Sequence, residues 1–398
     1  MSLLDTYREV APKGTIDFLQ RLAETVRGRK ILHINSTRVG GGVAEILRGL
    51  VPLLQDVGLE ARWEVITGTE DFFTATKSFH NALQGQGQNL SAELLQTYLD
   101  VNRKNAQELS LEGDYVIIHD PQPAALILQK PGGGRWIWRC HIDISHPQRK
   151  VWNFLRQFVV QYDGAIFSLP RFAQRLPIPQ FLIYPSIDPL SDKNRDLSAQ
   201  EQERILNRLN IPRDKPILLQ VSRFDRFKDP LGVIQAYRLV KKHHDVRLIL
   251  AGGGATDDPE GEVVLAEVRQ AAQNDPDILI LVLPPDANLE INALQRTATI
   301  ILQKSLREGF GLTVAEAMWK GKPVIGGFAG GIIVQLVYGV TGFTVNSNEG
   351  AAFRIHYLLD NPEIMTKMGE DAREYVRGNF LITRHLGDYL ALMHYWGS

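Results

Sequence analysis

The sequence has little cysteine and no long apolar runs, and these two absences exclude several classes of protein. Cys140 is the one cysteine in 398 residues, which excludes an intrachain disulfide and a cysteine-rich metal site. No apolar run approaches the roughly 20 residues that a membrane-spanning helix requires. The first residues, MSLLDTYREVAPKG, lack the basic segment and apolar core of a signal peptide. We therefore expect a protein of a reducing, cytoplasmic compartment.

An excess of charge of either sign is also missing. The chain has 44 basic and 45 acidic side chains and a formal net charge of −1, with no basic block. No nucleic-acid partner and no membrane partner is therefore expected. A length of 398 residues exceeds what one ordinary core holds, so two domains are expected.

Strand-like and helix-like segments alternate in both halves of the chain, which is typical of parallel α/β domains. A linker with Pro177, Pro179, Pro185 and Pro189, followed by a polar run over residues 191–202, separates the halves. The strand-like segments are 30–35, 61–66, 115–120, 135–141 and 164–168, then 216–223, 246–251, 278–283, 299–303 and 322–326. A helix is predicted over residues 5–28. We predict an α/β fold with two Rossmann-like domains, over residues 1–190 and 191–379.

Residues 304–317 carry the most specific motif, because glycines and acids lie there between a strand and a helix. Thr313 and Glu316 have the spacing of a capping box, so the helix is predicted to begin at Leu312 or Thr313. Glu308 then lies in the loop and Glu316 in the first turn, beside free amides and the positive end of the helix dipole. Two acids around an anion site suit a ligand with hydroxyls and phosphate, such as a nucleotide sugar. Alternatively, Glu316 only caps the helix and Glu308 is a surface acid.

Two further features of the second half favour the same anionic ligand. Arg223 ends a strand and Lys228 follows it, so that arginine can hold a diphosphate bidentately while lysine adds a point charge. Gly253 lies in a run of three glycines after the next strand, where a backbone can approach a ligand. Taken singly, these features are also compatible with solvated loop cations and a tight turn. Their joint occurrence with the acidic pair is more specific.

In the first half, polar residues end three strands, and ligands of open parallel sheets bind outside such ends. These residues are Asn35, His119, Asp120 and His141. The run Gly40-Gly41-Gly42 precedes a helix and could cradle a phosphate on helix-start amides. It matches neither the dinucleotide fingerprint nor the P-loop pattern, and a tight turn is the alternative.

Motifs for metal binding and for nucleophilic catalysis are incomplete. His141, Asp143 and His146 lie close in sequence, but no histidine, cysteine and carboxylate set completes a metal site. Residues 275–277, Asp-Pro-Asp, precede a strand and are interpreted as a turn. No Gly-x-Ser-x-Gly elbow is present, and Cys140 lies inside a strand predicted to be buried. Neither a metal site nor a serine or cysteine nucleophile is predicted.

The combination of Arg223, Lys228, the string Glu308-Gly309-Phe310-Gly311 and Glu316 with the first glycine loop resembles the retaining glycosyltransferases of family four, which have the GT-B fold. The resemblance covers nearly the whole chain. Longer strings are similar to the trehalose synthases of the glycosyltransferring type within that family. These strings are HINST at 33–37, TKSFHNALQG at 76–85, WRCHID at 138–143, DDPEG at 257–261, NALQR at 292–296 and AMWKGKPVIG at 317–326.

The resemblance implies roles for the motif residues. Arg223 and Lys228 would bind the donor diphosphate and stabilise it as it leaves, while Glu308 would hold hydroxyls of the transferred glucose. Glu316 would bind the ribose and His141 the donor sugar. Further donor-side residues would be Gly41, Gly42, Gly253, Phe310, Gly311 and Leu312. Acceptor contacts are assigned to Asp120, Gln122 and His80, with packing or helix capping as the alternative.

The implied activity is reversible synthesis of α,α-trehalose from a nucleoside diphosphate glucose and glucose. No cofactor would be required, and Mg²⁺ would at most accompany the nucleotide. A homodimer is compatible with the resemblance, and a C-terminal helix over about 380–398 would pack back on the first domain. The alternatives are a trehalose phosphorylase that uses orthophosphate, a nucleotide-sugar epimerase and a non-catalytic sugar-nucleotide binder. Residues 330–339 depart from the family by being apolar, with Tyr338 where an acid is common.

Overall fold

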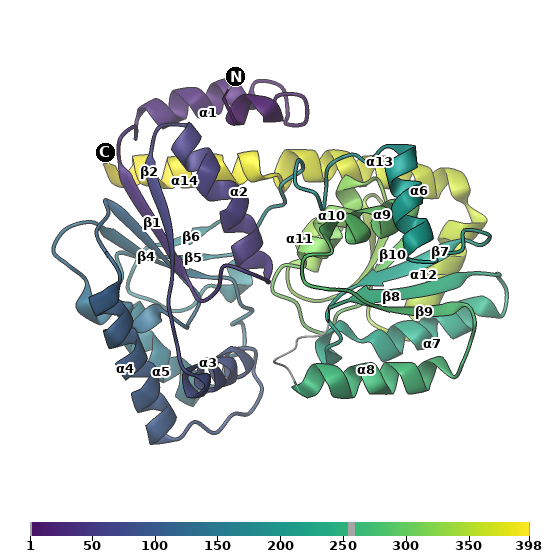
Figure 1. Cartoon of the computed structure of the whole chain (residues 1–398), viewed down its shortest axis with the longest axis horizontal. Coiled ribbons are helices and arrows are strands. Elements are labelled where there is room, and N and C mark those ends of the chain that lie inside the picture. Colours follow the sequence, from purple (N-terminus) through teal and green to yellow (C-terminus); the bar gives the residue numbers. More distant parts are fainter. Residues whose placement is uncertain (1, 254–258, 398) are drawn as a thin grey trace. The chain divides into compact units, whose positions relative to one another are not determined.

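The structure is a computed structural model that describes residues 2–253 and 259–397. The chain divides into two compact α/β units (Figure 1). The N-terminal unit comprises Met1–Ser186 and Ile382–Ser398, and the C-terminal unit comprises Ile187–Leu381. Each unit is described by itself below.

The N-terminal unit is built on a six-stranded parallel sheet with the order β2-β1-β3-β4-β5-β6. Its central strands are runs of valine, isoleucine and other apolar residues that are buried on both faces, as parallel sheets require. In chain order the strands are β1 Lys30–Asn35, β2 Glu60–Val65, β3 Tyr115–His119, β4 Arg135–Cys140, β5 Gly164–Phe167 and β6 Gln180–Leu182.

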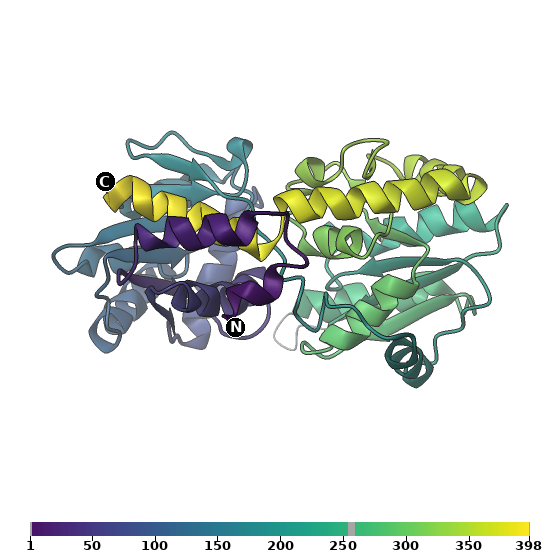
Figure 2. The same cartoon turned by 90° about the horizontal axis from the view of Figure 1, so that it is seen from above.

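The C-terminal helix of the chain belongs to this N-terminal unit, where it packs against α1 and α2 (Figure 2). Helices α3, α4 and α5 pack with one another and with a short 3-10 helix, η2. The helices are α1 Thr15–Glu24, α2 Gly42–Asp56, α3 Glu70–Leu83, α4 Ala92–Glu108, α5 Arg149–Val159 and α14 Ile382–Gly397; the 3-10 helices are η1 Leu4–Tyr7, η2 Ala124–Gln129 and η3 Pro170–Phe172.

The single helix predicted over residues 5–28 is wrong. The segment forms η1 and then, after an interruption, α1. Pro12 disfavours helical backbone in the residue before it, and Gly14 has a φ of 80°, which a continuous helix cannot contain.

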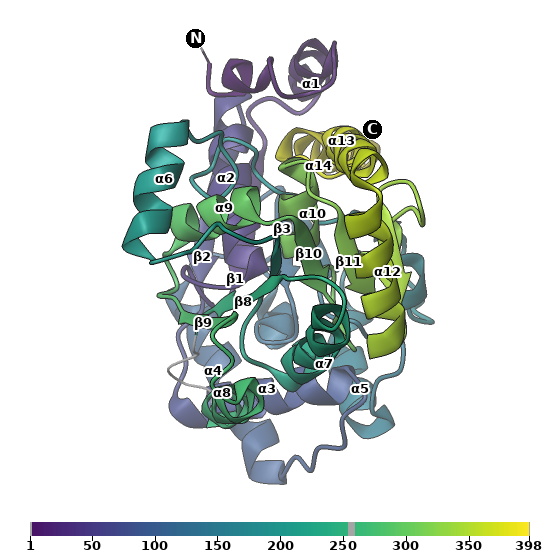
Figure 3. The same cartoon turned by 90° about the vertical axis from the view of Figure 1, so that its right-hand side faces the viewer.

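The C-terminal unit has a second six-stranded parallel sheet, with the order β12-β11-β10-β7-β8-β9. Helices α7 and α12 lie side by side on it (Figure 3). The strands are β7 Ile217–Val221, β8 Arg247–Gly252, β9 Ile278–Val282, β10 Ile300–Gln303, β11 Val324–Gly327 and β12 Gly342–Val345. The helices are α6 Ala199–Arg208, η4 Arg226–Lys228, α7 Pro230–Lys241, α8 Pro259–Ala272, α9 Asn288–Thr297, α10 Leu312–Trp319, α11 Ile332–Gln335, α12 Asn348–Asp360 and α13 Pro362–Asn379.

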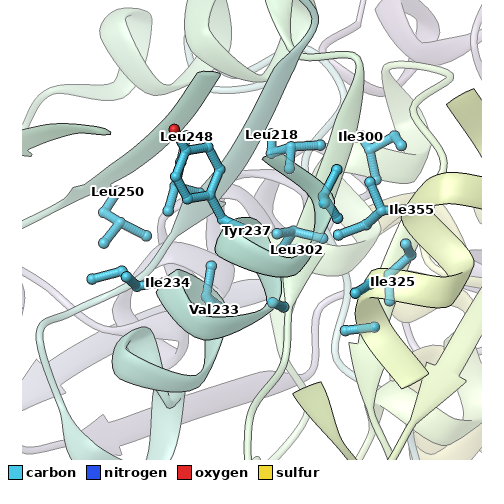
Figure 4. Packing of buried hydrophobic residues seen from close by; sticks show 14 of the residues in the cluster. Leu218, Val233, Ile234, Tyr237, Leu248, Leu250, Ile300, Leu302, Ile325 and Ile355 are labelled. Carbon is cyan, nitrogen blue, oxygen red and sulfur yellow. The ribbon is translucent and has the colours of Figure 1, made fainter. Parts of the chain in front are cut away.

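Apolar side chains between this second sheet and α7 and α12 form the core of the unit (Figure 4). The strands contribute Leu218, Leu248, Leu250, Ile300, Leu302 and Ile325, and the helices contribute Val233, Ile234, Tyr237 and Ile355. All of these side chains are at most 2% exposed. Because this core fixes the strands, it also fixes where the loops at their carboxyl ends begin. Among the described residues, no helix is long and apolar enough to cross a membrane.

Candidate functional site

The strand order of the C-terminal unit reverses between β7 and β10, which pair directly. In open parallel sheets, ligands bind outside the carboxyl ends of the strands at such a switch point. The loop after β7 carries Arg223 and leads to Lys228, and the loop after β10 carries Glu308. The topology therefore places three of the predicted site residues at the position where this fold class binds ligands.

An ion pair joins these two loops. The Nζ atom of Lys228 lies 2.6 Å from Oε2 of Glu308, and the two side chains are 18% and 10% exposed. Ser305 Oγ donates to the same carboxylate oxygen at 3.2 Å. The backbone N–H of Leu306 also donates to the carbonyl of Phe227 at 2.8 Å. The predicted cation and acid thus meet in one place, although they are 80 residues apart in sequence.

A second ion pair at the same edge was not predicted from the sequence. Lys304, at the end of β10, pairs with Asp229, and both side chains are largely buried. Asp229 has a φ of 51° and also accepts a hydrogen bond from the N–H of Gly232 at 3.1 Å, which caps α7. Asp229 directly follows Lys228, so the two ion pairs hold the loops at adjacent positions. The sequence does not indicate this pair, because a lysine that follows a strand is usually a surface residue.

Arg223 differs from these paired residues because its side chain is 62% exposed. Its Nη2 atom lies 3.3 Å from Asp225 Oδ2, a contact that contributes little in water. Asp225 itself is held by the N–H of Phe227, 2.6 Å from its Oδ1 atom. Most of the guanidinium therefore faces solvent, where it can accept an anionic ligand.

Helix α10 begins at Leu312, as predicted, but the capping-box interpretation is wrong. Gly311 is the N-cap, with φ 84° and ψ 66°, and no side chain caps the helix. The third helical residue is then Val314, so Glu316 lies too far along to bond back to the cap. The Glu316 side chain is 3% exposed, and its Oε1 atom lies 3.7 Å from Nζ of Lys193. The helix-start amides remain available to a ligand.

The apolar segment after β11 supports the Glu308 loop, which sequence reasoning missed. Gln335 Nε2 donates to the carbonyl of Phe310 at 2.6 Å. The N–H of Gly331 donates to the carbonyl of Gly309 at 3.0 Å. Gly330 has a φ of 47°, and a Cβ atom there would lie 1.5 Å from the carbonyl oxygen of Glu308. This segment therefore determines the shape of the loop that carries Glu308.

Gly252, the last residue of β8, has a packing role. A Cβ atom on Gly252 would lie 1.7 Å from the carbonyl oxygen of Ser222, so glycine is required for the strand end to approach the loop after β7. Gly253 has ordinary space around it, with Leu283 O 3.4 Å from the Cβ position. Gly254 and the Asp257-Asp258 pair lie outside the described residues.

The N-terminal unit has its own switch point, between β1 and β3. The loop after β1 contains Gly40 and Gly41, with φ values of 77° and 78°, and α2 begins at Gly42. A Cβ atom at Gly40 or Gly41 would meet no atom within 4 Å, so the left-handed backbone alone requires glycine there. Gly41 is the N-cap and has no capping side chain, which leaves helix-start amides for a ligand.

His141 and Asp120 lie together at the carboxyl ends of β4 and β3. The backbone N–H of His141 donates to Oδ1 of Asp120 at 2.7 Å. Its ring Nε2 lies 3.0 Å from Nδ1 of His119. Burial raises the pKa of Asp120 to about 7, against the bond from His141, which lowers it. Burial, and then the charge of Arg139, lowers the pKa of His141 well below its usual value, so the imidazole is neutral near pH 7.

The other two acceptor candidates show local contacts. Gln122 is partly buried, and its carbonyl accepts from Asn102 Nδ2 at 3.1 Å, while its Oε1 atom is buried without a partner among the described residues. His80 lies in the last turn of α3, with Nε2 3.2 Å from Gln84 Nε2. No contact recorded for the described residues joins either side chain to His141 or Asp120.

The Asp-Pro-Asp run and Cys140 have structural surroundings. Residues 275–277 form the predicted turn before β9, where the Asp277 carboxylate pairs with Lys215, Lys241 and Arg247. Burial raises the pKa of Asp277, but Lys215 and Lys241 outweigh it and lower the pKa to about 2. Cys140 is fully buried in β4. Within the described ranges, no three histidine, cysteine, aspartate or glutamate side chains are grouped to hold a metal ion.

Comparison with known proteins gives matches over most of the chain. Residues 33–174 match the family described as "Trehalose synthase, N-terminal domain", and residues 201–375 match "Glycosyl transferases group 1". The trehalose synthase of Pyrococcus horikoshii is 48% identical, over 99% of this chain and 97% of its own length. That of Rubrobacter xylanophilus is 44% identical, over 98% of this chain and 96% of its own length. A trehalose phosphorylase of Grifola frondosa is 30% identical over 94% of the chain, but over 58% of that protein.

Two solved structures show the same fold at low identity. A sucrose-phosphate synthase from Thermosynechococcus elongatus aligns with a TM-score of 0.71, at 17% identity, over 93% of this chain and 100% of that one. The trehalose-6-phosphate synthase OtsA aligns with a TM-score of 0.74, at 14% identity, over 92% of this chain and 98% of that one. The predicted fold class, two Rossmann-like domains of the GT-B type, is confirmed.

Proposed function

The chain belongs to the trehalose synthase family of glycosyltransferases, and from this premise we propose that it joins the glucose of a nucleoside diphosphate glucose to free glucose, giving α,α-trehalose reversibly. The observation that carries the proposal is the meeting of Lys228 and Glu308, 2.6 Å apart, at the switch point of the C-terminal unit. A cation for phosphate and an acid for sugar hydroxyls are the two groups that a nucleotide sugar needs side by side.

The donor would bind along the loops after β7 and β10. Arg223, which is exposed, and Lys228 would contact the diphosphate, and the carboxylate of Glu308 would accept hydrogen bonds from hydroxyls of the transferred glucose. Glu316 would bind the ribose. The remaining donor contacts are assigned to the backbone of Phe310, Gly311 and Leu312, to Gly253, and to Gly41 and Gly42 in the N-terminal unit.

In this proposal transfer proceeds with retention and without a covalent intermediate. A retaining glycosidase uses two carboxylates about 5 Å apart, one of them as nucleophile. Glu308 is occupied by Lys228 and Ser305, and Glu316 is buried beside Lys193. Neither carboxylate is therefore placed as a nucleophile.

The bond from C1 of glucose to the diphosphate would instead break as the acceptor oxygen bonds to C1 on the same face. The departing phosphate oxygen would take the acceptor proton, so no further base is needed. Positioning and stabilisation of the leaving charge by Arg223 and Lys228 would supply most of the rate.

The test is to incubate the enzyme with trehalose and each of a panel of nucleoside diphosphates, and to measure released glucose and the sugar nucleotide formed. We expect glucose release only when a nucleoside diphosphate is present. Release that needs orthophosphate and ignores nucleotides would instead indicate a phosphorylase. Conversion of the sugar nucleotide without an acceptor would indicate an epimerase, and binding without turnover would indicate a sugar-nucleotide binder.

A further inference from the structure

Three histidines are hydrogen-bonded in line at the carboxyl edge of the first sheet. Nδ1 of His33, on β1, lies 3.0 Å from Nε2 of His119, on β3. Nδ1 of His119 lies 3.0 Å from Nε2 of His141, which follows β4. The planes of successive rings are inclined by only 28° and 18°, with centroids 5.3 Å apart in both pairs. Because β1, β3 and β4 are neighbours in the sheet, this histidine relay crosses three adjacent strands.

The surroundings keep the relay uncharged. His33 is 0% exposed and His119 is 2% exposed. Burial lowers the pKa of His33 to about 3 and that of His119 well below its usual value, and the cation of Arg139 lowers the latter further. The ring of Tyr389, on α14, lies 5.5 Å from the His33 ring, and the His385 ring contacts Tyr389 in turn. Each imidazole in the relay therefore carries one N–H.

Counting these protons leaves two arrangements. A neutral His119 must donate one of its two hydrogen bonds and accept the other, so all the N–H groups point the same way along the relay. If they point toward His141, then His141 accepts at Nε2 and carries its own proton on Nδ1. If they point away, His33 must hold a proton on Nε2.

The environment of His33 decides between the two arrangements. Its Nε2 atom is buried and has no hydrogen-bond partner among the residues that the structure describes. An orphaned buried N–H is rarer and more costly than an unused acceptor. At the other end, His141 is partly exposed, and no described residue bonds to its Nδ1 atom. In the favoured arrangement, the buried Nε2 atom of His33 therefore has a lone pair and no proton, and the free N–H is on Nδ1 of the partly exposed His141.

We propose that His33 and His119 are positioning residues that hold His141 as the neutral Nδ1–H tautomer, so that it donates a hydrogen bond to an oxygen of the bound sugar. This inference rests on the proposed function for its ligand, but the tautomer itself does not depend on any ligand. In the opposite arrangement, His141 would present only a lone pair and could not donate. At metal sites, partners that fix the tautomer and orientation of a ligating histidine contribute about 10- to 100-fold to activity, and we expect an effect of that order from the partners of His141.

The direct test is ¹⁵N NMR of the full chain labelled in histidine, at pH 7.5 and without substrate. The signals of His141 are assigned from their loss in His141→Gln. We expect a protonated Nδ1 and an unprotonated Nε2 on His141, and the same pattern on His119. A protonated Nε2 on His141, or a mixture of tautomers, would overturn the proposal.

Two variants of His119 add a functional readout. His119→Phe keeps an aromatic ring at this position but removes the bond to His141, and should lower kcat for transfer about 10- to 100-fold while KM changes less. His119→Asn keeps an N–H near the Nδ1 position and should recover most of that loss. His356→Phe, which replaces a partly buried histidine of the other unit, is the control and should leave transfer unchanged. Equal activity of the Phe and Asn variants would contradict the relay. Absence of transfer in a wild-type chain that has the Nδ1–H tautomer would refute the proposed function and leave the relay standing.

Discussion

Replacing Lys228 by methionine removes a charge 2.6 Å from the Glu308 carboxylate and keeps most of the apolar length of the side chain. The Glu308 side chain is only 10% exposed, so water cannot replace the lost cation freely. Of the hydrogen bonds recorded for that carboxylate, the one from Ser305 Oγ at 3.2 Å would remain. We therefore expect Lys228→Met to destabilise the C-terminal unit and to disturb the loop that carries Glu308.

The expected magnitude lies between two limits. Removing one partner of a fully buried ion pair costs about 3–5 kcal/mol, whereas an exposed pair contributes about 0–1 kcal/mol. Because Lys228 keeps 18% exposure, we expect a loss of about 2 kcal/mol in the free energy of unfolding. Glu308→Gln should cost less, since the amide still bonds to Ser305. The coupling energy from the double variant should be about 1–2 kcal/mol.

The assay is denaturant unfolding followed by circular dichroism for the wild type, both single variants and the double variant. Lys367→Met is the matched control, because Lys367 is 68% exposed in its ion pair with Asp371, so its loss should change stability much less than the loss of Lys228. A coupling energy near zero, or a Lys228→Met variant as stable as the control, would show that the pair does not hold the two loops together.

Three other perturbations test the surroundings of the two sites. Gly330→Ala should lower the free energy of unfolding by more than about 2 kcal/mol. The φ of 47° opposes a side chain, and a Cβ atom would lie 1.5 Å from the carbonyl oxygen of Glu308. Gly87→Ala is the control in the same unfolding assay, because a Cβ atom there would meet no atom within 4 Å. Gln335→Leu should lower the free energy of unfolding by about 1–3 kcal/mol, because it leaves buried carbonyl groups unpaired. A transfer assay should also show lower activity. Unchanged stability would contradict the proposal that Gln335 supports the Glu308 loop. The folded pKa of His33, about 3, lies below its ordinary value of 6.5, so its contribution to stability is complete above pH 6.5 and falls by about 1.4 kcal/mol per pH unit below it. His33→Phe should therefore flatten the fall in unfolding free energy between pH 6.5 and 5 by about 2 kcal/mol, and an unchanged slope would contradict a buried, neutral His33.

The sequence identifies the ends of most strands because buried parallel strands are short apolar runs with polar residues after them. The loops that follow β7 and β10 could be located in this way, and Arg223, Lys228 and Glu308 with them. The contact between Lys228 and Glu308 could not be predicted from the sequence. It depends on β7 and β10 being neighbours in a sheet whose strand order differs from the chain order.

Local patterns misled where backbone conformation decides the outcome. Thr313 and Glu316 fit a capping box with Thr313 as the N-cap, but the left-handed Gly311 is the N-cap, two residues earlier. Residues 330–339 were interpreted as an apolar departure from the family, whereas Gly330 and Gln335 in this segment contact the backbone of the loop that carries Glu308. His33 read as one more residue of a buried strand, because nothing in the sequence shows which side chain faces it from β3.

The rate of transfer by Arg223→Ala tests the central claim most directly, that the loop after β7 stabilises a departing diphosphate. Losing one strong oxyanion donor costs about 3 kcal/mol in the transition state, so kcat with a nucleoside diphosphate glucose and glucose should fall roughly 100-fold. Arg226→Ala, which removes a neighbouring arginine that pairs with Glu267 at 2.8 Å, is the matched control and should retain most activity. Turnover of Arg223→Ala close to that of the wild type would contradict the account.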